Sequence, residues 1–186
     1  MDLRPSERTD DGKRSGKLDF GVVPDASPPP STTYLSVIEW FESKEWSYDS
    51  SAEHDSVGST IRLKDCAVRL RCSVYHQDDW RRVTAYAVFH AYVPENRRTA
   101  MAEALARINY SLAVGAFNLD MSDGEVSARN WHSSDTDINL EMIDRTANRA
   151  LNLAEKFFPA LMAVAFGGAS PKDVLELANR DDETVQ

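Results

Sequence analysis

The sequence has few of the residues that build metal sites, disulfide frameworks or membrane spans. Its 186 residues include two cysteines, Cys66 and Cys72, whose C-x5-C spacing fits no common zinc pattern and is too sparse for a disulfide scaffold. We interpret both as free thiols of a cytoplasmic protein. The longest apolar run, 157–166, contains Pro159 and is far shorter than the ~20 residues that cross a bilayer. The polar N-terminus lacks the apolar segment of a secretory signal.

Motifs for catalysis and cofactor binding are also missing. No G-x-S-x-G, HExxH, CxxC, G-x-x-x-x-G-K or GxGxxG pattern occurs. Strand alternation places Cys72 and His76 on one face of a strand and His90 on the opposite face of the next, so we do not expect them to share a metal. Paired carboxylates fall at predicted turns and helix starts, where Asp bonds its own backbone. We therefore predict no catalytic residue, metal or cofactor.

Basic residues are too few to balance the acidic ones. Lys and Arg number 21 and Asp and Glu number 30, which gives a formal net charge of −9. Phosphate backbones and anionic lipid surfaces repel such a chain. We expect neither nucleic acid nor a membrane as a partner.

Composition divides the chain into a folded body and two tails. Residues 1–31 are polar, mix opposite charges and close on Pro28-Pro29-Pro30, which predicts a disordered N-terminal tail. Residues 32–178 alternate helical and strand patterns and suit one domain. Residues 179–186 read as an acidic C-terminal tail.

The first half of the body predicts one helix and three strands. A helix begins at a cap among residues 31–33 and ends near Lys44. A short strand contains Ile61 and Leu63. The apolar positions then change from odd-numbered to even-numbered residues, which requires a bulge or turn near 64–65. Two longer strands, 68–75 and 82–93, flank a turn at 77–80.

The second half predicts helices around a hairpin. Pro94 opens a helix that ends before Gly115. Asp123-Gly124 favours a type I′ turn, which would pair Met121 with Val126 and Leu119 with Ala128.

Two more helices close the body. A long helix starts near 135–137 and is kinked or broken at Pro159, and a short one follows Ser170. The fold class is therefore α+β: an antiparallel sheet packed with helices in the order α-β-β-β-α-β-β-α, with a further short helix.

One surface has the composition of a binding site. Arginine and tyrosine side chains share the outward faces of the two long strands, and these residue types are frequent in interface hot spots. The alternative is an ordinary solvent face or one covered by a helix. The residues are Arg69, Arg71, Tyr75, Tyr86, His90 and Tyr92.

A set of residues in the second half resembles the YbjN-domain family of bacterial proteins. The strongest part of the resemblance runs from 109 to 129, and the whole covers roughly 32–175. The matching residues are Ile108, Asn109, Gly115, Phe117, Asp120, Asp123, Gly124, Glu125, Val126 and Arg129, then 158–161, Gly167, Ser170 and Pro171.

The resemblance implies a fold and a mode of action. Members are described as sensory-transduction regulators whose fold is similar to that of type III secretion chaperones. It implies a cytoplasmic protein that binds other proteins, often as a dimer, without catalytic residues or a cofactor. The chain departs from the family in its long N-terminal segment and in the short strand near Ile61.

These observations favour a non-enzymatic protein-binding or regulatory module, chaperone-like in fold. A small-molecule sensor with a pocket between the sheet and the apolar 157–166 segment is the alternative. An enzyme would require Cys72, His76 and His90 to converge. The same apolar segment also suggests a homodimer.

Overall fold

The computed structural model describes residues 31–77 and 80–180. The predicted tails, apart from Ser31 at one end and residues 179–180 at the other, lie outside these residues, as do Asp78 and Asp79 of the predicted turn. The strands are β1 (Asp49–Ser51), β2 (Ser56–Arg62), β3 (Ala67–Gln77), β4 (Trp80–Phe89), β5 (Ala116–Leu119) and β6 (Val126–Ser134). The helices are α1 (Thr32–Ser43), α2 (Arg98–Ser111), α3 (Leu140–Ala165) and α4 (Val174–Arg180), with 3-10 turns η1 (Glu95–Arg97) and η2 (Pro171–Asp173).

The described strands form one six-stranded antiparallel sheet in the order β1-β2-β3-β4-β6-β5. The predicted α+β class is confirmed. The predicted short strand is the end of β2, and the turn expected at 64–65 follows it, where the Leu63 amide donates to the Cys66 carbonyl at 2.8 Å. Strand β1 was not predicted, and β4 ends at Phe89 rather than Val93.

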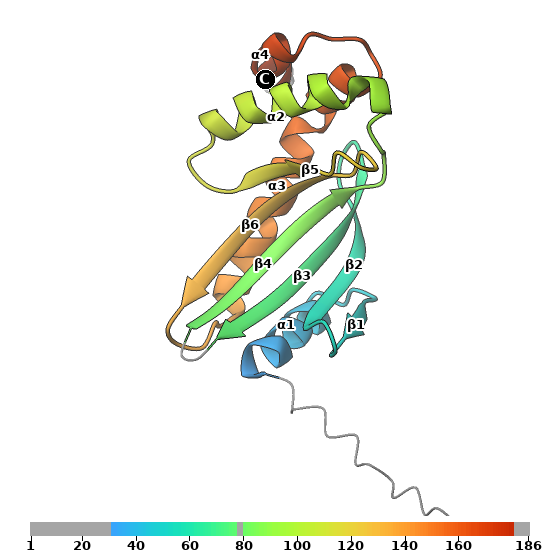
Figure 1. The fold of residues 1–186 in the computed structure, drawn as a ribbon. Coiled ribbons are helices and arrows are strands. Elements are labelled where there is room, and N and C mark those ends of the chain that lie inside the picture. Colours follow the sequence, from blue (N-terminus) through green and yellow to red (C-terminus); the bar gives the residue numbers. More distant parts are fainter. Residues whose placement is uncertain (1–30, 78–79, 181–186) are drawn as a thin grey trace, which may run out of the picture.

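Helices cover one face of the sheet. Helix α3 runs behind β3, β4 and β6, while α2 and α4 lie together at the end of the sheet near β5 (Figure 1). Alternate residues of the central strands, such as Leu70, Cys72 and Ala85, are fully buried under these helices. The opposite face of the sheet has no helix in front of it among the described residues (Figure 1).

Helix α1 is capped as its sequence predicts and is tied to α3. The Ser31 hydroxyl accepts from the Tyr34 amide at 3.2 Å. At the other end of α1, Asp144 of α3 accepts from Lys44 Nζ at 2.7 Å and from Trp40 Nε1 at 3.0 Å. Because Trp40 is 2% exposed, this carboxylate supplies the acceptor that its indole N–H needs.

The β5–β6 connection corrects the predicted register. Leu119 pairs with Val126 and Phe117 with Ala128, two residues away from the predicted alignment, and Met121 is 53% exposed. Only Gly124 of the expected type I′ pair has a positive φ, +90°. The loop instead closes through side chains: Asp120 accepts from the Ser122 amide at 2.7 Å, and Arg98 donates to the carbonyls of residues 121–123.

The start of α3 differs from the prediction, and the helix is not broken at Pro159. Asn139, rather than an aspartate at 135–137, caps the helix by accepting from the Met142 amide at 3.0 Å. The helix continues past Pro159 to Ala165. Proline removes one backbone bond, to the Glu155 carbonyl, but the buried residues Phe157 and Leu161 hold both sides of that position against the core.

The family-motif residues Asn109 and Gly115 have structural roles. The Asn109 side chain donates to the Phe117 carbonyl at 3.0 Å and accepts from the Phe117 amide at 2.7 Å. One side-chain amide thus pairs with the outer edge of β5 as a neighbouring strand would. Gly115 has φ +82°, and a Cβ there would lie 2.6 Å from the Leu153 Cδ1 atom.

Candidate functional site on the helix-free face of the sheet

The helix-free face of β3, β4 and β6 carries arginines stacked on aromatic rings. Arg71 lies over Tyr86 at 5.1 Å, and Arg129 lies over Trp131 at 5.4 Å from guanidinium carbon to ring centre. Arg82 lies over two rings, Tyr75 at 5.4 Å and Trp80 at 5.2 Å. We call this set the arginine face; its members are Arg71, Tyr75, Trp80, Arg82, Thr84, Tyr86, Arg129 and Trp131.

Strand register brings these residues together. Tyr86 is paired with Arg71 on one side and Arg129 on the other, and Arg82 is paired with Tyr75. Trp131 pairs with Thr84, which is 8% exposed because its larger neighbours cover it. Side chains two apart on a strand share a face, so the three strands build the set from alternate positions.

A hollow of about 250 Å³ opens at the centre of the arginine face. Its floor is Thr84, and its sides are Tyr86, Trp131 and the side chains of Arg82 and Arg129. The Nε atom of each of these two arginines is out of reach of solvent and has no hydrogen-bond acceptor. Two cations therefore flank one hollow with part of their donor capacity unused.

Among the described residues, carboxylates are scarce on this face. Asp49 on β1 forms an ion pair with Arg69 on β3, at the margin of the arginine face. No carboxylate among residues 31–77 and 80–180 pairs with Arg71, Arg82 or Arg129. Three cations thus stand together on a protein whose formal net charge is −9.

The structure places four of the six surface residues predicted from sequence on this face. Arg69, Arg71, Tyr75 and Tyr86 lie at outward positions of β3 and β4. His90 and Tyr92 are exposed but follow the end of β4, so the sheet does not position them.

The surface predicted from sequence did not include five members of the site: Trp80, Arg82, Thr84, Arg129 and Trp131. Trp80 falls before the predicted start of the strand, and Trp131 falls beyond the end of the predicted hairpin. Arg82 and Arg129 lay within predicted strands. Each is two residues from another member of the site, Thr84 or Trp131, and this spacing could have placed them on the same face.

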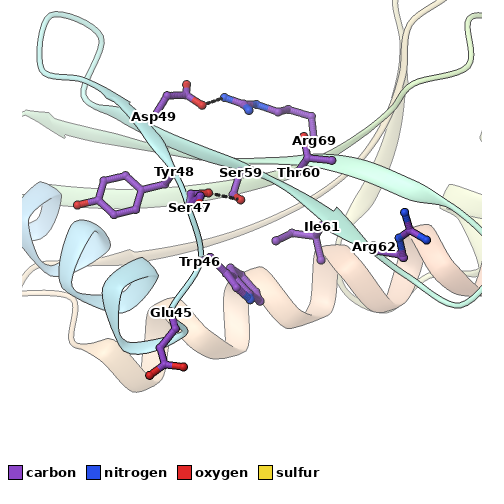
Figure 2. A pocket seen from close by; sticks show the side chains of 10 residues that line it. All are labelled: Glu45, Trp46, Ser47, Tyr48, Asp49, Ser59, Thr60, Ile61, Arg62 and Arg69. Atoms are coloured by element: carbon purple, nitrogen blue, oxygen red, sulfur yellow. Dashed lines mark hydrogen bonds and ion pairs between the residues drawn. The ribbon is translucent and has the colours of Figure 1, made fainter.

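A second hollow, of about 700 Å³, lies at the edge of the sheet where β1 diverges from β2 (Figure 2). The segment 45–48 forms one wall with Trp46 and Tyr48, and Ile61 and Arg62 of β2 form the other. The Ser59 hydroxyl ties the walls together by donating to the Ser47 carbonyl at 2.6 Å. The pocket predicted from sequence is at a different place, beside the 157–166 segment, where Phe157 packs on Phe117 and Phe158 on Phe89.

The cysteines and histidines do not assemble into a reactive group. Complete burial raises the pKa of the Cys72 thiol to about 12, and burial with nearby Glu155 and Asp65 raises that of Cys66 to about 11. In the described part of the chain, no three His, Cys, Asp or Glu side chains are placed to hold a metal ion. In the same part, no helix is long and apolar enough to cross a bilayer.

The remaining family-motif residues lie in the β5–β6 loop. Asp123 accepts from the Glu125 amide at 2.8 Å, and the Gly124 carbonyl accepts from the Val93 amide at 2.9 Å. Hydrogen bonds from Ser122 hold the pKa of Asp120 below its usual value. Of the family motif, only Arg129 belongs to the arginine face.

Comparison with known proteins agrees with the resemblance of 109–129. No curated protein matches the chain. The crystal structure of YbjN from E. coli, described as a "putative transcription regulator", matches with 14% identity and a TM-score of 0.45 over 72% of this chain and 90% of that chain. Residues 36–163 match the family model of YbjN, described as "putative bacterial sensory transduction regulator". That match spans more than half of the sequence, and the chain belongs to the YbjN family.

Proposed function

We propose that this chain is a non-enzymatic regulatory module of the cytoplasm that acts by binding a protein partner through the arginine face. The observation that carries the proposal is the open sheet face itself, with Tyr75 and Trp131 each nearly half exposed beside stacked arginines. Tyrosine, tryptophan and arginine are the residues most enriched in interface hot spots. The family description as a regulator supports the same function.

The thiols support the non-enzymatic part of the proposal. A nucleophilic cysteine needs a lowered pKa and access to solvent. Cys72 is fully buried, and the pKa values of both thiols are raised.

The test is affinity capture from the source cell with quantitative mass spectrometry on three matched chains. These are the wild type, the face variant R71A/R129A, and the control variant R107A/R145A. The control removes two exposed arginines that pair with Glu103 and Glu141 on helices. We expect at least one protein to be captured by the wild type and the control and lost from the face variant. Identical protein sets from all three chains would reject the proposal.

The edge hollow favours a second candidate function, a small-molecule sensor. Its volume of about 700 Å³ lies within the range of ligand pockets, and Trp46 and Tyr48 supply aromatic walls. Metabolites extracted from the purified protein should then include a compound that a W46A variant fails to retain. If wild type and variant release the same compounds, the sensor function is wrong.

A homodimer remains an independent proposal. Phe166, at the end of α3, is 57% exposed and is the outward part of the apolar 157–166 segment. Light scattering should give twice the chain mass of 20.8 kDa at high concentration, and a constant monomer mass would contradict it.

A further inference from the structure

We infer that the partner segment recognised by the arginine face is an acidic peptide, whose carboxylates meet Arg71, Arg82 and Arg129. The inference rests on the proposed function and names the chemistry of its partner. It follows from the charge of the face, the placement of its guanidinium groups and the occupation of its rings.

Charge is the first step of the argument. Arg71, Arg82 and Arg129 have no carboxylate partner among the described residues, although the whole chain carries nine more acidic than basic residues. Elsewhere on the described surface, arginines such as Arg107 and Arg145 do have acidic partners. Three cations without a described carboxylate partner thus stand together on one face, and a segment with several negative charges is complementary to it.

The second step is the orientation of the guanidinium groups. Each lies over an aromatic ring, at 5.1–5.4 Å from its centre. A guanidinium held over a ring still has N–H groups in its own plane, and a carboxylate can accept two of them. The rings therefore fix the arginines before a partner arrives, which reduces the side-chain entropy lost on binding.

The central hollow gives one carboxylate a defined place. It lies between the side chains of Arg82 and Arg129, with Thr84 at its floor. A volume of about 250 Å³ accommodates an Asp or Glu side chain. An anion there would offset the electrostatic cost of two neighbouring cations that are partly withdrawn from water.

The same features disfavour a nucleic acid. Single-stranded nucleic acids bind sheet faces by stacking bases on free aromatic rings. Here Tyr86, Trp131, Tyr75 and Trp80 each already have a guanidinium over the ring. A nucleic-acid strand carries a charge at every nucleotide, whereas a peptide can present three charges and then end.

Fluorescence anisotropy with the full chain tests the inference. The probes are a labelled decapeptide of alternating glutamate and serine, its glutamine–serine counterpart, and a labelled single-stranded decanucleotide. We expect saturable binding of the glutamate peptide that weakens with salt, and at least tenfold weaker binding of the other two probes. Absence of saturable glutamate-peptide binding, equal binding of the glutamine peptide, or tighter binding of the oligonucleotide would overturn the inference.

Matched variants locate the binding. R82Q/R129Q should weaken binding of the glutamate peptide at least tenfold, while R107Q/R145Q, which removes the same charge from helix surfaces, should leave it unchanged. R82K/R129K keeps the charge and serves if the glutamine variant does not fold. It should retain the salt dependence but bind more weakly, because lysine cannot stack on a ring or donate two parallel hydrogen bonds to one carboxylate. Equal loss in the face and control variants would overturn the inference.

The two proposals fail separately. If R71A/R129A loses a cellular partner that the glutamate peptide does not displace, the proposed function stands and the acidic chemistry is wrong. If the peptide binds the arginine face but capture from cells is unchanged by R71A/R129A, the acidic chemistry stands and the proposed function is wrong.

Discussion

The backbone conformation of Gly124 and its close contact with Val93 leave no room for a side chain. Gly124 has φ +90°, and a Cβ there would lie 2.2 Å from the Val93 carbonyl oxygen. We expect Gly124→Ala to lower the free energy of unfolding by about 2–4 kcal/mol, from backbone strain together with a backbone clash. Urea denaturation measures the change.

Gly168→Ala is the matched control for that prediction. Gly168 also has a positive φ, +71°, but no atom lies within 4 Å of a Cβ built there. Strain alone, partly offset by the lower entropy of the unfolded chain, should cost about 1 kcal/mol or less. If both alanine variants lose the same stability, the clash with Val93 has no energetic role.

The Asp144 carboxylate makes stability depend on pH. The hydrogen bond from Lys44, helped by that from Trp40, holds the pKa of Asp144 below its usual value. A lowered pKa stabilises the fold above the unfolded-state value of about 3.9, and this contribution is lost as pH falls through the folded-state pKa. We expect Asp144→Asn to cost about 1 kcal/mol at pH 7 and much less at pH 2–3.

Chemical denaturation at several pH values checks this prediction. Asp144 is about a third exposed, so solvent screening keeps the effect modest. Asp137→Asn is a suitable control, because Asp137 pairs with Arg81 at 3.2 Å and is 63% exposed, which predicts a smaller loss. A stability difference for Asp144→Asn that is constant from pH 7 to pH 2 would contradict the assignment.

At the level of elements, the edge of β5 depends on one side chain. Asn109 provides both a donor and an acceptor to Phe117. We expect Asn109→Ala to destabilise the protein by about 1–3 kcal/mol, because the strand loses both partners in a part-buried site. Asn109→Asp keeps the acceptor but replaces the donor by a second oxygen against the Phe117 carbonyl, so it should not restore stability. Thermal unfolding compares the two variants, and full stability of Asn109→Asp would reject the strand-like role.

The part of β2 that β1 does not cover predicts which backbone amides exchange fastest with solvent. The amide of Val74 donates to Asp55 and that of Leu63 to Cys66, so odd-numbered residues of β2 bond to β3 in this ladder. The amides of Thr60 and Arg62 then point to the opposite edge, where β1, which pairs with residues 56–58, does not reach. Their exchange should be about 100-fold or more faster than that of Ser59 and Ile61, measured by NMR.

The elements also show what sequence patterns can and cannot predict. Alternation found β3 and β4, because each buries every second residue against helices. It could not find β1, Asp49-Ser50-Ser51, which buries no apolar side chain. The hairpin register failed because Arg98, which is far along the chain, holds the loop through three carbonyls and replaces the local turn.

The site was predictable in kind but not in extent. Outward parity placed Arg71, Tyr75 and Tyr86 on one face, and the structure agrees. The pairing of β4 with β6 rather than with β5 is a matter of tertiary topology. Arg129 and Trp131 join the face only through that pairing, which no local pattern records.

For the whole molecule, the rates at which a thiol reagent modifies the two cysteines distinguish local exposure from global unfolding. Cys72 lies in the middle of the sheet, fully buried, while Cys66 is part-exposed in the β2–β3 turn. With the pKa of Cys66 raised to about 11, a thiol reagent should modify it slowly, about tenfold faster for each pH unit up to that value. Cys72 should react only through global unfolding.

A C66S variant isolates Cys72 for this measurement. Its labelling rate should rise with urea in parallel with the equilibrium unfolded fraction. Labelling of Cys72 that is independent of urea would show that the helices separate from the sheet without unfolding the molecule.

The hydrogen bonds of Asn109 affect how the sheets of two molecules can pair edge to edge. A sheet extends into a filament only if both of its edges accept a further strand. At the β5 edge, Phe117 has no free main-chain group, because Asn109 occupies both. At the other edge, Thr60 and Arg62 remain open in the described part of the chain. Edge-to-edge pairing at Phe117 would therefore have to displace the Asn109 side chain, whereas pairing at Thr60 and Arg62 would displace no described group.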